Sequence, residues 1–263
     1  MTALITLQEE AGLVAGRFFE SNNGKYAVVT RRLTEICEEG ADKDFLLIHN
    51  PGGWGITHLD ELLQWERSIV EGVSAKIESL GYSRLLFQYF RSGHGYREIC
   101  RDLREQMRFF EVKAGLMAAE LEFILNHLKR IKVLMIGVSQ GAAFSNAVLQ
   151  RMNGSRRIYD IELGMPFYYK SRKITGERTL ALESNGLMPD ALMEWNVPTI
   201  VRTYAGAPVR WLKYKLQGKN IKFTYCINVP GHDYNWDYPE VQRQIEDFLV
   251  QNFGNKKAEV EIK

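Results

Sequence analysis

The sequence predicts an α/β fold in which helices cover both faces of a mostly parallel sheet, within a single domain over residues 1–263. Short, continuous apolar runs alternate along the chain with segments of helical periodicity. Several of these runs end abruptly in loops that are rich in glycine. No internal repeat, low-complexity segment or long linker divides the chain. The carboxyl ends of the strands should therefore meet at one edge of the sheet, where α/β folds bind their ligands.

Periodicity and turn residues predict the individual elements in order. The segments 13–20 and 26–33 are rich in β-branched and aromatic residues and flank a turn at 21–24, which predicts a hairpin. Strands are expected at 45–48, 85–90, 131–136, 158–163, 199–204 and 221–229. Helices are expected at 59–80, 96–129, 142–152 and 239–253, the second with a bend at Gly115. The interval 167–197 is expected to form a short cap-like segment.

Composition excludes several classes of protein. Charged residues make up 25% of the chain and nearly cancel to a formal +2, unlike the strongly basic balance of nucleic-acid-binding proteins. Cys37, Cys100 and Cys226 are far apart and form no CxxC pair, which predicts reduced thiols and neither a disulfide framework nor a metal site. Glu9 and Glu10 follow the first apolar stretch without a basic segment before it, which argues against a secretory signal. We expect a cytoplasmic protein without a membrane span or cofactor.

The pentapeptide Gly-Val-Ser-Gln-Gly at 137–141 lies between an expected strand and an expected helix. A sharp turn there would expose the Ser139 hydroxyl at the edge of the sheet, and Gly137 and Gly141 suit the crowding of such a turn. A glycine-rich turn with an incidental serine is the alternative. The strand-to-helix context favours Ser139 as a nucleophile.

A serine hydroxyl is a poor nucleophile unless a base takes its proton. His232 follows the expected strand 221–229 and precedes the last helix, so its loop should open at the same edge as Ser139. His58 and His127 lie at or within helices, where surface or packing roles are more common. We therefore expect His232 to be the base, with a solvated loop histidine as the alternative.

Acyl transfer also needs N–H donors for the developing oxyanion. The backbone N–H of Gln140, which follows Ser139, supplies the first. The loop His-Asn-Pro-Gly-Gly at 49–53 should supply the second, and since Pro51 has no N–H, the donor must be Asn50 or Gly52. The alternative is a turn that only leads into the next helix.

These motifs, in this order, resemble the α/β-hydrolase family. Members carry a histidine- and glycine-rich oxyanion loop, an Arg-x-Gly-x-Gly turn, a nucleophile turn and a late Gly-His, which match here 49–53, 91–95, 137–141 and 231–232. The resemblance covers about residues 13–253 and implies a serine esterase or thioesterase that acts through an acyl-enzyme.

One departure from the family pattern concerns the acid that orients the histidine. The family commonly places it in a Gly-x-x-Asp loop after the strand that is expected here at 199–204, and this chain has Val209 at that position. The remaining carboxylates are weak candidates: Glu162, Asp160, Asp190 and Glu194. Asp233 adjoins His232 in sequence, which is poor geometry for gripping its ring. None is assigned, so a catalytic dyad and a site that has lost hydrolysis both stay open.

The sequence says less about the substrate than about the catalytic residues. Aromatic residues gather after residue 167, where most would pack in the core and a few could line an apolar acyl pocket. Residues 151–222 hold 13 Lys and Arg against 6 Asp and Glu, as expected of a solvated face or of a site for an anionic or carrier-bound acyl group. We expect a small-molecule ester or thioester substrate. A carbon–carbon or amide bond hydrolase and a non-catalytic ligand-binding protein are the alternatives.

Overall fold

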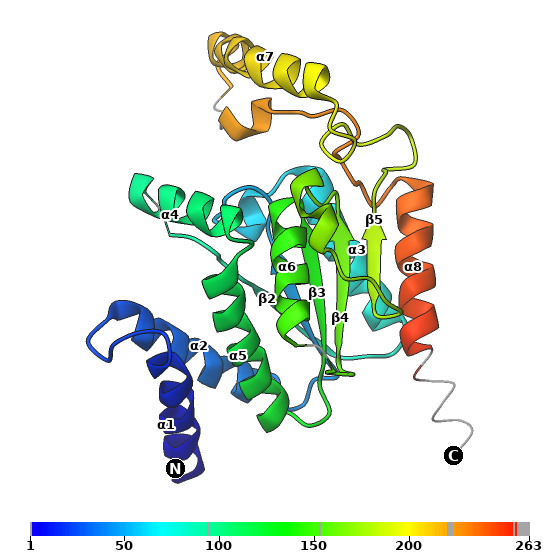
Figure 1. Ribbon diagram of the computed structural model, residues 1–263. Coiled ribbons are helices and arrows are strands. Elements are labelled where there is room, and N and C mark those ends of the chain that lie inside the picture. Colours follow the sequence, from blue (N-terminus) through cyan, green and yellow to red (C-terminus); the bar gives the residue numbers. More distant parts are fainter. Residues whose placement is uncertain (1, 94, 153, 220–222, 255, 257–263) are drawn as a thin grey trace.

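The computed structural model describes residues 2–93, 95–152, 154–219, 223–254 and 256 (Figure 1). The described residues form a parallel five-stranded sheet with the strand order β2-β1-β3-β4-β5. The strands are β1 Phe45–Asn50, β2 Arg84–Gln88, β3 Lys132–Val138, β4 Ile158–Leu163 and β5 Thr179–Leu182. The expected α/β fold with a parallel sheet is thus confirmed.

Helices cover both faces of this sheet (Figure 1). One face carries α5 Glu111–His127 and α6 Gln140–Arg151, with α1 Thr2–Gly16 and α2 Gly24–Glu39 packed outside them. The other face carries α3 Gln64–Ser79 and α8 Pro239–Phe253. The remaining helices are α4 Tyr96–Met107, α7 Val197–Leu216 and the short 3₁₀ segments η1 Leu59–Glu61, η2 Phe167–Arg172 and η3 Phe223–Cys226.

The central strands are almost completely buried and mostly apolar because both of their faces are covered. In β1, Leu46 and Ile48 face the α5–α6 side, whereas Phe45 and Leu47 face the α3–α8 side. All four are at most 2% exposed. Strands that are covered on both faces are expected to be continuously hydrophobic and not to alternate. The sheet edge that holds the candidate site is therefore supported by two buried layers.

The expected N-terminal hairpin is wrong, since residues 13–20 and 26–33 belong to α1, α2 and the turn between them. The turn itself is real. Asn23 is the N-cap of α2, and its side chain accepts a hydrogen bond from the Lys25 N–H. On α2, Val29, Leu33 and Ile36 are buried at helical spacing against the core. Packing of this helical face outweighs the strand preference of its β-branched residues.

The last two expected strands are also wrong. Residues 199–204 lie inside α7, and the described part of 221–229 contains η3. Asn196 caps α7 by accepting from the Thr199 N–H, and Pro198 suits the first turn of a helix. The fifth strand is β5, inside the interval 167–197 that we expected to be a cap. The loop after β5, rather than the loop after residue 204, therefore opens at the sheet edge.

The long helix expected at 96–129 is two helices. The break falls at Phe109 and Phe110, which have φ values of 54° and 58°, and not at the bend expected at Gly115. Phe110 is fully buried and its ring lies 5.5 Å from that of Phe144 on α6, so packing holds this left-handed backbone in place.

Candidate active site

Ser139 occupies a sharp turn between β3 and α6. Its backbone has φ 51° and ψ −116°. Residues other than glycine rarely adopt this region of backbone conformation, which costs about 1–3 kcal/mol. The Ser139 N–H donates to the Leu163 carbonyl at the end of β4 over 2.7 Å, and the Ser139 carbonyl accepts from the Ala142 N–H. These bonds hold a strained residue at the carboxyl edge of the sheet, where strain commonly marks a functional position.

Glycine is required on both sides of Ser139. A methyl group on Gly137 would lie 2.6 Å from Cα of Ala142. A methyl group on Gly141 would lie 2.0 Å from the carbonyl oxygen of Asn50, at the end of β1. Contacts below 3.0 Å with backbone atoms cannot be relieved by turning a side chain. The turn is thus packed directly against the loop that we expected to bind the oxyanion.

His232 is paired with Asp190, which follows β5. Its Nδ1 lies 2.7 Å from Oδ2 of Asp190. The Asp190 carboxylate is fully buried and also accepts from the Tyr234 hydroxyl at 2.8 Å and from the Leu192 N–H at 2.9 Å. A carboxylate with several donors is fixed in position and holds an imidazole by its Nδ1–H. In that tautomer Nε2 is the ring nitrogen that carries the lone pair.

The contacts of Gly164 connect this pair to Ser139. Gly164 directly follows Leu163, whose carbonyl accepts from Ser139. A methyl group on Gly164 would lie 2.7 Å from Cε1 of His232 and 2.9 Å from Oδ2 of Asp190. The His232 ring therefore lies on the backbone immediately after the residue that anchors the serine turn. All three side chains are positioned at the same edge of the sheet.

The other candidate carboxylates lie elsewhere. Glu194 is exposed on the same loop as Asp190. Asp233 accepts from Asn185 and Tyr238 rather than from His232. Asp190 is only a weak candidate in the sequence because β5 gives no clear strand signal. The loop after β5, which contains Asp190, therefore does not stand out as the loop after the last strand. The available signal was Pro189-Asp190 at the end of a loop that begins with Ser184-Asn185-Gly186.

The remaining described histidines have structural partners. His49 is fully buried, with Nε2 3.1 Å from Glu66 and Nδ1 3.2 Å from Gln88. His127 contacts Glu10 and the Phe123 carbonyl, and the ring of His58 packs on Phe90. His94 lies outside the described residues. His232, by contrast, lies against Gly164, next to the residue that anchors the serine turn.

Two of the three expected oxyanion residues lie beside Ser139. Gln140 is the first residue of α6, and first-turn N–H groups have no partner within their helix. A methyl group on Gly52 would lie 3.8 Å from Cβ of Ser139. The Gly52 N–H, however, donates to Glu66 over 3.2 Å. Asn50, whose backbone N–H was the other expected donor, is fully buried at the end of β1, and its side-chain amide donates to Ser145.

Arg91 holds the loop at 51–55 in a fixed conformation, a role that the sequence did not reveal. Its guanidinium donates to the carbonyls of Pro51 and Gly53, each over 2.6 Å. Because C=O and N–H point in opposite directions across a trans peptide, these bonds also orient the N–H groups of the residues that follow. Burial lowers the pKa of Arg91 to about 10, which leaves it charged at neutral pH. Arg91 is therefore a positioning residue for the oxyanion loop.

The sheet, the serine turn and the order of the site residues occur together. The turn follows β3, which lies between β1 and β4, and Ser139, Asp190 and His232 follow one another along the chain. A nucleophile on a strand-to-helix turn, followed in the chain by the acid and then the base, is characteristic of one fold. This arrangement resembles the α/β-hydrolase fold.

Comparison with solved structures gives a structural likeness at low sequence identity. A Trichoderma reesei cutinase in complex with a C11Y4 phosphonate inhibitor matches over 93% of this chain and 90% of that chain, with 12% sequence identity and a TM-score of 0.43. No protein-family model matches the sequence. No curated protein matches it either.

Asp160 and Glu162, two other candidates for the acid, are buried in β4, and within the described part of the chain neither is hydrogen-bonded to His232. Glu162 accepts from Asn146 at 2.6 Å, and burial nevertheless raises its pKa to about 7. Burial and the neighbouring Glu162 raise the pKa of Asp160 well above its usual range. This pair is a buried acidic cluster below the site and not part of it.

The Glu162 carboxyl should make stability depend on pH. Between about 4.5, its ordinary pKa, and about 7, the folded protein binds more protons here than the unfolded chain does, so the free energy of unfolding falls as pH rises. We expect Glu162→Gln to remove a penalty of up to about 3 kcal/mol at pH above 7 and to gain little at about pH 4.5. Urea unfolding of both proteins at the two pH values measures this difference. An equal difference at both values would contradict the assignment.

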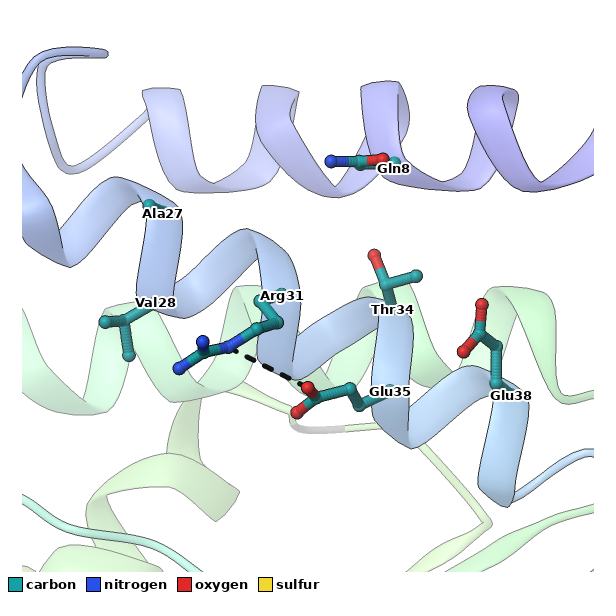
Figure 2. Close-up of a pocket in the computed structure, with 7 residues that line it drawn as sticks. All are labelled: Gln8, Ala27, Val28, Arg31, Thr34, Glu35 and Glu38. Carbon is teal, nitrogen blue, oxygen red and sulfur yellow. Dashed lines mark ion pairs between the residues drawn. The ribbon is translucent and has the colours of Figure 1, made fainter.

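A separate groove of about 480 Å³ lies between α1 and α2 (Figure 2). It is lined by Gln8 on α1 and by residues of α2, among which Arg31 and Glu35 form an ion pair over 3.8 Å. None of its lining residues belongs to the serine site. Among the described residues no group of three or more His, Cys, Asp or Glu side chains is placed to hold a metal ion.

Proposed function

We propose that the protein is a serine hydrolase that cleaves an ester or thioester through an acyl-enzyme. The 2.7 Å contact between His232 and Asp190, on the backbone that anchors the strained Ser139, carries this proposal. Nothing in ordinary packing requires a strained serine, a histidine and a buried carboxylate at one sheet edge. Acyl transfer by an activated serine requires all three.

Each side chain then has a defined step. The Ser139 hydroxyl attacks the substrate carbonyl while Nε2 of His232 takes its proton. His232 returns that proton to the leaving alcohol or thiol as the acyl-enzyme forms. It next takes a proton from the water that attacks the acyl-enzyme, and it returns this proton to the Ser139 oxygen as the acid leaves. Asp190 holds the ring and stabilises the imidazolium in both halves of the reaction.

The oxyanion is assigned to the backbone N–H groups of Gln140 and Gly52. Gln140 lies at the positive end of the α6 dipole, which favours negative charge there. The Gly52 N–H now faces Glu66, and an oxyanion would have to replace that 3.2 Å bond. Arg91 supports this role, since it fixes the peptide of Pro51 and Gly52 from the opposite side. The buried Asn50 side chain supports the turn through Ser145.

Aromatic side chains surround the proposed site and favour an apolar acyl group. The Trp65 ring lies 6.5 Å from that of His232, and the Tyr168 hydroxyl donates to the side chain of Gln140. Phe167 packs on Trp195 with ring centroids 3.6 Å apart. An anionic or carrier-bound leaving group stays a prediction from the basic residues of 151–222. A cytoplasmic location stays a prediction from the cysteines; none of the described helices could cross a bilayer.

The position of Asp190 bears on the competing functions. A non-catalytic protein was considered because the acid was missing, and the Asp190 contact with His232 removes that motive. A carbon–carbon or amide bond hydrolase would use the same three side chains. A panel of nitrophenyl esters, acyl thioesters, nitroanilides and β-diketones separates these reactions.

The decisive experiment is covalent labelling with a fluorescent fluorophosphonate, which reacts with serines that a neighbouring base activates. We expect stoichiometric labelling of the wild-type protein and none of Ser139→Ala. Ser171→Ala, which removes an exposed serine, should label like the wild type. The nitrophenyl esterase activity should fall with the labelling.

Two outcomes would argue against the proposal. Labelling that persists in Ser139→Ala would place the reactive serine elsewhere. A folded wild-type protein that resists the probe and hydrolyses none of the panel would favour a ligand-binding role.

A further inference from the structure

Helix α7 belongs to a long loop that lies in the chain between Asp190 and His232, the proposed acid–base pair. The chain leaves after Asp190, runs through α7 and η3, and returns to His232. In Figure 1 α7 lies beyond the carboxyl edge of the sheet, away from the helices that cover its faces. It packs mainly on η3, where the Trp211 and Phe223 rings are 6.2 Å apart and Arg210 donates to the Cys226 carbonyl.

On α7 the small residues are buried and the large apolar residues are exposed, the reverse of a normal surface helix. Small residues face inward: Thr203 and Ala207 are its buried positions. Large apolar residues face solvent, with Val201 60%, Val209 70%, Leu212 54% and Leu216 81% exposed. At about 100° per residue these four positions fall within one arc, opposite the buried pair. A surface helix of a soluble domain normally turns such an arc toward the core.

The charges of α7 all have one sign. The helix carries Arg202, Arg210, Lys213 and Lys215 and contains no Asp or Glu. Arg202 and Lys213 are exposed and, by the same helical spacing, border the apolar arc beside Val209. Lys215 lies over the Trp211 ring at 4.1 Å. An apolar face with basic residues at its border is typical of helices that lie in the surface of a bilayer.

We propose that α7 docks on a lipid bilayer that contains anionic phospholipids. The apolar arc enters the interface between headgroups and acyl chains, and Arg202 and Lys213 contact lipid phosphates. Charge complementarity selects this occupant, since a second copy of the chain docked through the same face would bring two cationic helices together. The proposal goes beyond the proposed hydrolase function and does not depend on it.

Co-sedimentation with vesicles tests the proposal on the intact protein. One set of vesicles is pure phosphatidylcholine, and the other contains about 30% phosphatidylglycerol. We expect the wild type to sediment with the anionic set and only weakly with the neutral set. The combined variant Val209→Gln/Leu212→Gln/Leu216→Gln should bind at least about tenfold more weakly. Arg202→Gln/Lys213→Gln should bind the anionic vesicles roughly 30-fold more weakly at low salt.

A matched control replaces exposed apolar residues on other helices, in Leu13→Gln/Val250→Gln, and should bind like the wild type. Circular dichroism and hydrolysis of a soluble ester verify that the α7 variants are folded. If the esterase activity is absent from every protein while binding follows this pattern, the hydrolase proposal fails and the docking proposal stands.

Three results would overturn the docking proposal. The wild type could stay in the supernatant with anionic vesicles. The α7 variant could sediment as well as the control. The wild type could prove in sedimentation velocity to be a dimer that the α7 variant makes monomeric, without vesicle binding by either, which would assign the face to a second copy.

Discussion

Replacing Asp190 with asparagine is expected to lower kcat for a nitrophenyl ester about 10⁴-fold while leaving the protein folded. The carboxylate lies 2.7 Å from Nδ1 of His232, so it selects the tautomer in which Nε2 can accept the serine proton. An amide of the same shape can turn its NH₂ toward the ring and favour the wrong tautomer. It also provides no negative charge to stabilise the imidazolium. Steady-state kinetics with the purified variant measure the loss.

Two further variants define the specificity of this effect. Glu194→Gln alters an exposed carboxylate on the same loop and should change kcat by less than about threefold. Tyr234→Phe removes one donor to Asp190 and leaves the ion pair in place, so it should have a much smaller effect than Asp190→Asn. If Asp190→Asn kept kcat within about tenfold of the wild type, the carboxylate would not be the acid of a triad.

Replacing Gly141 with alanine should reduce the free energy of unfolding by about 3 kcal/mol or more. The added methyl would lie 2.0 Å from the Asn50 carbonyl oxygen and 2.9 Å from that of Pro51. Both are backbone atoms, so the first turn of α6 must move away from the end of β1. That shift would also strain the bond between Asn50 and Ser145. Thermal and urea unfolding measure the loss, and we expect the reaction with the fluorophosphonate to fall with it.

The matched control is Gly176→Ala, because a methyl group there meets nothing within 4 Å. Its stability should lie within about 0.5 kcal/mol of the wild type. Equal stability of the two alanine variants would mean that the serine turn and the end of β1 are less tightly packed than the structure shows.

The sequence was sufficient to predict the layers of the fold and the position of the serine turn. Strands β1 and β3 are covered on both faces, so each appears in the sequence as an almost continuous apolar run, whereas β4 also carries the buried carboxyls of Asp160 and Glu162. The crowding at Gly137 comes from Ala142, within a few residues of Ser139. The crowding at Gly141 comes from Asn50 on another strand, so there the serine-turn motif and not local packing predicted the glycine. Features that depend on local sequence and complete burial were therefore predictable.

The acid of the site was not predictable because its position depends on an edge strand. β5 has four residues, pairs only with β4, and has three half-buried positions, so it lacks a continuous apolar signal. The segment 199–204 is richer in β-branched residues, but its capping residue Asn196 and its Pro198 start a helix. If 199–204 were the last strand, the acid would be expected at position 209, where this chain has valine. Asp190 is identified by tertiary structure alone.

In the N-terminal segments, residue type predicted strands where the structure has helices. Val29 and Leu33 have side chains that favour strands, yet they recur at helical spacing and pack against the core. Helical periodicity over 29–37 was the better guide than residue type in this region. Glu66 and Arg91 could not be assigned for another reason, since their roles are contacts with backbone atoms far along the chain.

The long loop that carries α7 leaves the body and returns to it at neighbouring points. The Ala191 N–H donates to the Pro230 carbonyl over 3.1 Å, and Gly231 lies so close to Pro189 that a methyl group there would be 2.1 Å from its carbonyl oxygen. Asp190 and His232 are thus held by these contacts at the base of the loop and not by α7 at its tip. The loop between these two contacts can therefore differ in length or composition while the proposed acid–base pair keeps its geometry.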